Sequence, residues 1–137
     1  MERVRGGDRA SWRGELTRAT IRKAQCPALV FAGDIEKEVV GDGIARQILG
    51  YGPDLMVVRV WFEKGSVGEV HAHPHSQSTY VESGKFEVFI DGETRVLRAG
   101  DGFYIAPGLD HGAVCLERGV LIDTFNPLRE DFLGESA

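Results

Sequence analysis

The chain has 137 residues, 42% hydrophobic and 27% charged, which suits one globular domain with a buried core. Its net charge of −5 argues against a nucleic-acid-binding surface, because such surfaces carry an excess of Lys and Arg. Two cysteines, Cys26 and Cys115, are too few for a disulfide framework and fit a reducing compartment. The longest apolar run near the start, residues 27–32, is far below the roughly 18 residues that span a bilayer. We therefore expect a cytoplasmic protein that binds neither nucleic acid nor membrane.

Residues 1–28 are expected to form an N-terminal extension. Most of this segment is polar, and the only helix that the sequence indicates covers residues 15–25, where apolar residues recur at helical spacing. Pro27 would end that helix, because the residue before a proline disfavours helical backbone angles. The extension is expected to pack on the rest of the chain or on a partner subunit.

Residues 29–137 show the pattern of an all-β barrel or sandwich. Short runs rich in Val, Ile and Phe alternate with turns rich in Gly and Asp, and Asp91-Gly92 is a strong hairpin signal. A last turn is expected at residues 129–133. The expected strands cover residues 29–31, 36–40, 45–49, 55–62, 69–73, 78–83, 85–90, 94–98, 102–105, 112–116 and 120–126.

Residues 55–62 form a nearly continuous apolar run. Such a run is typical of a strand that is buried on both faces. It is expected to be a central core strand or, alternatively, part of a homodimer interface.

All four histidines lie between Gly65 and His111. Residues i and i+2 of a strand point to the same face, so His71 and His73 would aim two imidazoles at one point. Imidazole is a common ligand for divalent first-row metals. Gln77 could add an amide oxygen after the turn at Pro74, and His111 could close the site from a second hairpin. The alternative is a set of surface histidines on a loop.

This stretch resembles the two sequence motifs of the cupin family. The first motif is matched by Gly65, His71, His73, Gln77 and Gly84, with Gln77 at a position where the family has Glu. The second is matched by Gly100, Gly108 and His111, while Ala106 and Cys115 replace the family's Pro and Asn. The resemblance implies a small double-stranded β-helix, or jelly-roll, barrel.

The resemblance also implies one divalent metal ion held by His71, His73, Gln77 and His111. Gln in place of Glu removes a negative charge from the ligand set, which favours Lewis-acid use over a redox role. The ligand types admit Zn, Ni, Fe or Mn and do not decide among them.

The last predicted strand adds a second candidate element. With a period of two, Leu121, Asp123 and Phe125 share one face, so Asp123 points into the barrel if Leu121 does. A carboxylate in that position is costly unless it is paired or functional. The alternative is that Asp123 faces solvent and Phe125 caps the barrel.

Residues 45–133 also resemble the pectin-degradation cupins of the KdgF type, above all in the run from Asp123 to Phe132. Enzymes of that group linearise 4,5-unsaturated uronates to 5-keto-4-deoxyuronate. By matching positions, Asp123, Phe125 and Arg129 would be the catalytic and substrate-binding residues. Asp123 would move a proton, Phe125 would form an apolar wall, and Arg129 would pair with a carboxylate unless it forms a surface ion pair.

The resemblance implies a small acidic sugar as substrate and a homodimer as the assembly. His75 is a candidate for a hydrogen bond to a substrate or to a ligand residue. Other cupin enzymes, such as a dioxygenase or a sugar isomerase, remain alternatives on the same ligands. So does a non-catalytic cupin that binds a small acid.

Overall fold

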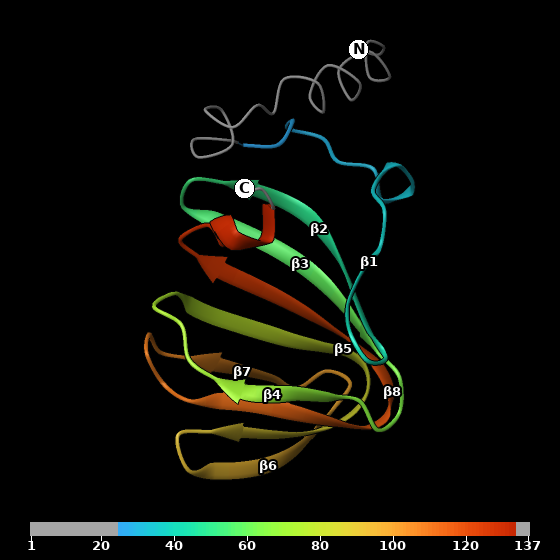
Figure 1. The fold of residues 1–137 in the computed structure, drawn as a ribbon, viewed down its shortest axis with the longest axis vertical. Helices are drawn as coiled ribbons and strands as arrows, with labels where there is room; N and C mark the ends of the chain where they lie inside the picture. Colours follow the sequence, from blue (N-terminus) through green and yellow to red (C-terminus); the bar gives the residue numbers. More distant parts are fainter. Residues whose placement is uncertain (1–24, 134–137) are drawn as a thin grey trace.

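The computed structural model of the chain describes residues 25–133, which form an antiparallel β-barrel (Figure 1). Residues 25–133 contain no α-helix, and none of their helical turns is long or apolar enough to cross a membrane. The elements in chain order are η1 (Ala32–Asp34), β1 (Glu38–Gly41), β2 (Ile44–Gly52), β3 (Leu55–Phe62), β4 (Val67–His71), β5 (Ser76–Ile90), β6 (Glu93–Arg98), β7 (Gly102–Ile105), β8 (His111–Asn126) and η2 (Glu130–Leu133).

Two long strands, β5 and β8, tie the barrel together. Hydrogen-bonded strands follow the order β1-β2-β3-β8-β5-β6, while β4 pairs with β8 and β7 pairs with β5. The first half of β8 pairs with β4 and its second half with β3; the first half of β5 pairs with β7 and its second half with β6. Both strands therefore take part in two curved layers, as Figure 1 shows at the right of the barrel. This confirms the predicted double-stranded β-helix.

Glycines explain why these two strands are continuous, where the sequence predicted a break in each. The pairing of β5 with β8 shifts register between Val81 and Phe86. Gly84 has φ +88°, and a Cβ on it would lie 2.5 Å from the Cα of Gly119. The missing side chains let the two strands cross closely and bend. The predicted ends near Gly84 and Gly119 are therefore wrong, because these residues mark irregularities inside the strands.

The segment before β1 also differs from prediction. Residues 29–31 are not a strand, and they lead into the 3-10 turn η1. The side-chain amide of Gln47 donates hydrogen bonds to the carbonyls of Ala32 and Ile35, at 2.9 and 2.7 Å. A buried side chain thus holds this segment in place of a strand partner. The predicted turn near the end is confirmed as η2, whereas the predicted helix lies outside the described residues except for Gln25, which is not helical. The division of the chain at residue 28 stays a prediction.

The core lies between the layers. Along β3 the buried residues alternate with half-buried ones, and Leu55 is 50% exposed, so the prediction of a strand buried on both faces is wrong. Phe62 and Phe86 meet edge to face at 5.2 Å between ring centroids. The most deeply buried side chains are Phe86, Met56, Ile105, Val58, Val81 and Cys115.

Candidate active site

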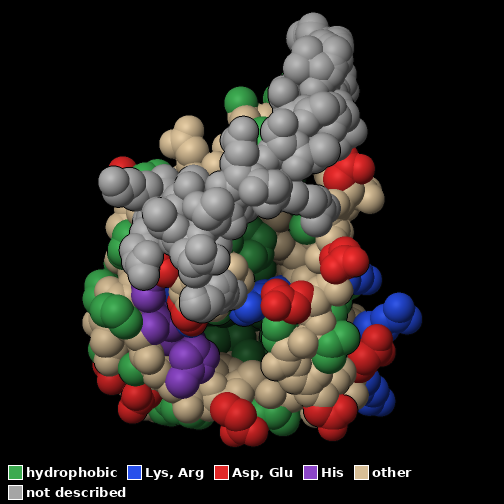
Figure 2. All heavy atoms as spheres, turned by 45° about the horizontal axis from the view of Figure 1, so that its top comes forward, with side chains coloured by type: hydrophobic (Ala, Val, Ile, Leu, Met, Phe, Trp, Pro, Cys, Tyr) green, Lys and Arg blue, Asp and Glu red, His purple; other side chains and the backbone are tan. Residues whose placement is uncertain are grey.

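A cavity of about 370 Å³ opens inside the barrel. Figure 2 shows it as a hollow with hydrophobic side chains in its depth and histidines beside its mouth. Its apolar lining includes Val60, Val88 and Leu121. A few polar side chains among apolar ones are the usual composition of a site for a small ligand. The polar residues that line this cavity are His71, Gln77, His111, Asp123, Arg46 and Arg129.

Three histidines form a cluster, and two of them, His71 and His111, border this cavity. His71 is the last residue of β4 and pairs in register with His111, the first residue of β8, while His73 lies just after β4. Each ring offers one nitrogen, and these nitrogens lie within 4.8 Å of one another. The structure thus brings together three of the predicted metal ligands, although His73 lies beyond the strand that was expected to align it with His71.

The three imidazoles share one pattern of contacts with the backbone. In every case Nδ1 lies 2.8–3.1 Å from a backbone carbonyl two residues away. A carbonyl only accepts, so Nδ1 carries the hydrogen and Nε2 of the neutral ring presents its lone pair. Nε2 of His111 is buried and has no hydrogen-bond partner, and burial lowers the pKa of His111. A divalent cation fits this donor set.

Gln77 adds an oxygen to the same point. Its Oε1 lies 2.9 Å from Nε2 of His73, and its Nε2 donates to the hydroxyl of Thr79 at 2.9 Å. Thr79 in turn donates to Oδ1 of Asp123 at 2.7 Å, so its hydroxyl must accept from Gln77. The amide orientation is thereby fixed, and with the hydrogen of His73 on Nδ1 two acceptors face each other. A cation at this point would satisfy both.

Asp123 is the carboxyl group at the other end of this hydrogen-bonded chain. It lies on the inward face of β8 between Leu121 and Phe125, which are 4% and 2% exposed, and it borders the cavity. Burial raises the pKa of Asp123 to about 6, against the opposing effects of the Thr79 hydrogen bond and the Arg129 charge. Such a carboxyl can both hold and release a proton near neutral pH.

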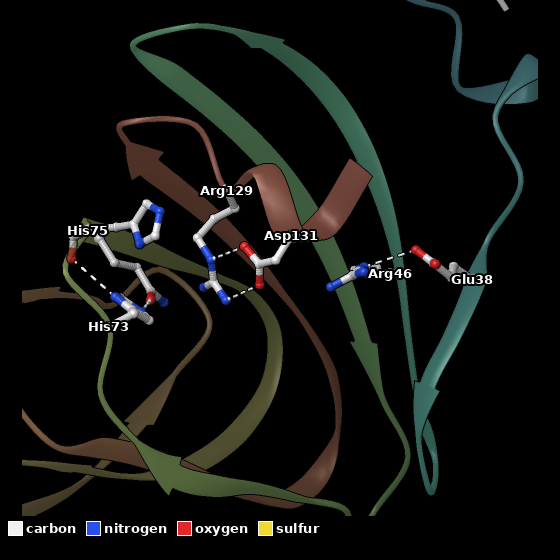
Figure 3. A network of polar contacts seen from close by, with 7 residues as sticks. Glu38, Arg46, His73, His75, Arg129 and Asp131 are labelled. Atoms are coloured by element: carbon white, nitrogen blue, oxygen red, sulfur yellow. Dashed lines mark hydrogen bonds and ion pairs between the residues drawn. The ribbon is translucent and has the colours of Figure 1, made fainter. Parts of the chain in front are cut away.

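Arg129 and Phe125 lie beside Asp123. The Arg129 side chain is only 13% exposed, it borders the cavity, and its guanidinium lies 5.0 Å from the Phe125 ring centroid. Its Nε and Nη2 also bind the two carboxylate oxygens of Asp131, at 3.1 and 2.9 Å (Figure 3). Arg129 therefore forms the alternative ion pair that the sequence left open, and it faces the cavity as well.

His75 lies outside the cluster of three histidines. Its ring stands 5.5 Å from that of His73 and 6.4 Å from that of Phe125, and its buried Nδ1 has no hydrogen-bond partner. Burial, followed by the charge of Arg129, lowers the pKa of His75.

Two polar residues of the site were missed by the sequence analysis: Thr79 and Arg46. The signal for Thr79 was its parity, since it lies two residues from Gln77 and two from the buried Val81. The signal for Arg46 was an arginine at an apolar position of an alternating strand, between Ile44 and Ile48.

A jelly-roll barrel that gathers three histidines and an amide oxygen at its cavity defines a cupin, and residues 58–124 match the family model described as Cupin domain. The pectin degradation protein KdgF of Dickeya dadantii is 51% identical over 98 residues, which cover 70% of this chain and 89% of that protein. The chain therefore belongs to the cupins and, among them, to the family of KdgF.

Solved structures give the same grouping. An RmlC-like cupin from Shewanella frigidimarina is 52% identical, with a TM-score of 0.77 over 79% of this chain and 97% of that one. KdgF from Halomonas sp. is 41% identical, with a TM-score of 0.74 over 77% of this chain and 98% of that one. The first match confirms the barrel fold, and the second confirms the resemblance noted from the residues.

Proposed function

We propose that the protein is a metal-dependent enzyme that linearises 4,5-unsaturated uronates to 5-keto-4-deoxyuronate. One observation carries the proposal: Asp123, with a pKa of about 6, borders the cavity and is linked through Thr79 and Gln77 to His73, one of the three clustered histidines. The KdgF relative is described as a pectin degradation protein, and unsaturated uronates are the monomers that pectin lyases leave. A small acidic sugar is accordingly the proposed substrate.

His71, His73, Gln77 and His111 are the proposed ligands of one divalent metal ion. When bound, such an ion supplies Lewis-acid chemistry toward a substrate carboxylate and its neighbouring oxygen. The neutral amide of Gln77 leaves the full charge of the ion available for that purpose. Zn, Ni, Fe and Mn are all compatible with these ligands.

The reaction is an isomerisation in which every atom of the substrate is kept. The C1 hydroxyl loses its proton, the bond from C1 to the ring oxygen breaks, and C1 becomes an aldehyde. The electrons of that bond pass to the oxygen on C5, which gives an enolate across C4 and C5. Protonation at C4 then yields the C5 ketone. Asp123 accepts the first proton as a carboxylate and returns a proton to C4, a role that its raised pKa supports.

Arg129 and Phe125 position the sugar for this transfer. Arg129 uses Nε and Nη2 for Asp131, so Nη1 and the second hydrogen of Nη2 are the donors left for a substrate carboxylate. Its low exposure limits competition from water. Phe125 is 2% exposed and stands edge to face with His73 at 5.8 Å, so it forms a fixed apolar wall beside the histidines.

Incubation of the metal-loaded protein with unsaturated galacturonate tests the proposal. The absorbance of the conjugated enol ether should fall faster than in a protein-free control, and the product should have the mass of the substrate. The same assay without oxygen should give the same rate, whereas a dioxygenase would stop. Full metal occupancy without turnover of any unsaturated uronate would instead favour a non-catalytic cupin.

A further inference from the structure

Arg46 is a charged side chain on the inward face of β2. It pairs in register with Val60 of β3, both residues border the cavity, and its side chain is only 15% exposed. Its neighbours at the same parity, Ile44 and Ile48, pack against the core. A guanidinium in such a position is costly unless it has partners or a ligand.

The known partners of Arg46 occupy only part of its hydrogen-bonding capacity. Nε donates to Glu38 at 3.0 Å (Figure 3). The guanidinium stacks 3.8 Å from the ring centroid of Phe132. Within residues 25–133, no hydrogen bond is made by its two terminal nitrogens. Five N–H groups on a planar fork are suited to two neighbouring oxygen atoms, and four of these N–H groups belong to the terminal nitrogens.

Ring contacts give the position of Arg46 relative to the histidines. The ring of Phe125 lies 5.8 Å from that of His73 and 5.6 Å from that of Phe132, and Arg46 stacks on Phe132. Arg129 stands over both phenyl rings, at 5.0 and 4.1 Å. Arg129 thus contacts the ring that meets His73, whereas Arg46 lies one ring farther from the histidines, beyond Arg129 in Figure 3.

The chemistry of the substrate, if the proposed function holds, says which of its groups would lie toward Arg46. With the C6 carboxylate and the ring oxygen directed to the histidines and Arg129, the far edge of the sugar carries the C2 and C3 hydroxyls. The double bond removes the stereocentres at C4 and C5. Unsaturated uronates from pectin and from alginate therefore differ in configuration only at C2, apart from the interconverting C1.

We propose that Arg46 donates a forked pair of hydrogen bonds to the C2 and C3 hydroxyls of the uronate. Arg46 is then the residue that decides which of the two unsaturated uronates the protein prefers. It acts in binding, because neither hydroxyl changes its bonding during the reaction.

The test compares Arg46→Gln and Arg46→Lys with Arg59→Gln. Arg59 is the matched control, since it also forms an ion pair, with Glu82 at 3.4 Å, and lies near an aromatic ring, but it does not border the cavity. For each protein, kcat and KM are measured with the pectin-derived and the alginate-derived unsaturated monouronate at equal metal content. Thermal unfolding is recorded alongside.

Wild type should prefer one sugar, and Arg46→Gln should raise KM for it by about tenfold to a hundredfold, as loss of charged hydrogen bonds does. kcat should change by less than about threefold, because uniform binding is lost. The ratio of the two kcat/KM values should fall toward one. Arg46→Lys should have a KM and a ratio between those of wild type and Arg46→Gln. Arg59→Gln should have the KM and the ratio of wild type.

Several outcomes would overturn the inference while the proposed function stands. These are a wild type that turns over both sugars equally, an Arg46→Gln variant that keeps the wild-type ratio, or a fall in kcat that accompanies lost thermal stability. The last result would assign Arg46 a purely structural role. A wild type that turns over neither sugar would overturn the proposed function, and this inference with it.

Discussion

At the scale of single residues, Asp123 is the side chain whose removal is most informative. We expect Asp123→Asn to lower uronate turnover by about 10² to 10⁴, the usual loss when a positioned proton carrier is removed. Asn keeps the size of the side chain and can still accept from Thr79, whose hydroxyl lies 2.7 Å from Oδ1. Fold and metal content should therefore survive. The measurement is turnover of wild type and variant at equal metal content.

Glu87→Gln is the control for that variant, because Glu87 is an exposed carboxylate on the outward face of β5. It should leave turnover unchanged. If Asp123→Asn keeps more than about a tenth of the wild-type rate, its loss is smaller than the expected hundredfold minimum. Asp123 then does not carry the proton. His75 would become the better candidate, since its ring stands near Phe125 and its buried Nδ1 is unpaired.

Period-two parity explains which site residues the sequence could predict. The inward orientation of Asp123 could be predicted from Leu121 and Phe125 on the same strand. The structure places all three beside the core or the cavity. Thr79 matters because it lies opposite Asp123 in the register of β5 with β8. That register joins residues 44 positions apart, and no local pattern of residue types determines it.

At the scale of elements, the crossing of β5 and β8 depends on Gly84. A Cβ there would meet the Cα of Gly119 at 2.5 Å and the carbonyl oxygen of Arg118 at 2.6 Å, both of which belong to the backbone. We expect Gly84→Ala to destabilise the protein by about 2–4 kcal/mol, from backbone strain and overpacking together. Urea unfolding monitored by circular dichroism measures the change.

Gly92→Ala separates the two causes. Gly92 has φ +89°, nearly the same as Gly84, but a Cβ on it would meet nothing within 4 Å. Gly92→Ala should therefore lower the free energy of unfolding only by the cost of the backbone conformation, about 1–2 kcal/mol. Equal losses in the two variants would show that the close approach of β5 and β8 contributes nothing.

The strand boundaries show the limit of local reasoning at this scale. Glycine is a correct signal for an irregular backbone, but whether a strand ends or bends there depends on what crosses it. Gly84 faces Gly119 of another strand, so both strands continue. Gly92 lies in a tight turn between β5 and β6, where the hairpin was predicted from Asp91-Gly92 and is present. Residues 55–62 and 102–105 were predicted with the bounds that the structure gives.

At the scale of the whole molecule, we expect two copies to pair. Strand β1 lies at one end of the strand order, all four of its residues are exposed, and Val39 is 80% exposed. Within residues 25–133 no strand pairs with the outer edge of β1, and an exposed edge strand can pair with that of a second copy. Light scattering at micromolar concentration should give twice the chain mass, and Val39→Lys should lower it to that of one chain. Val96→Lys, on the opposite edge strand β6, should not, and a monomeric wild type would contradict the expectation.

The proposed metal ion would join parts of the barrel that are distant in the sequence. His71 ends β4, His111 begins β8, and Gln77 lies in the half of β5 that pairs with β7. An ion that binds only the folded chain adds about 2.7 kcal/mol at a hundred times its dissociation constant. In a domain of this size that corresponds to a rise in Tm of roughly 10 °C. Chelator-treated protein should therefore unfold at a lower temperature and recover when a divalent metal is added.

His73→Ala tests whether this stabilisation belongs to the histidine cluster. His73 is not part of the apolar core cluster, so the barrel should still fold, with an unchanged far-ultraviolet spectrum. Elemental analysis should find little bound metal in His73→Ala, and added metal should not raise its Tm. His75→Ala should bind metal and gain Tm like wild type, because His75 is not one of the three clustered histidines. If both variants respond to metal equally, the ion binds elsewhere, and the Nε2 atoms of the cluster serve another ligand.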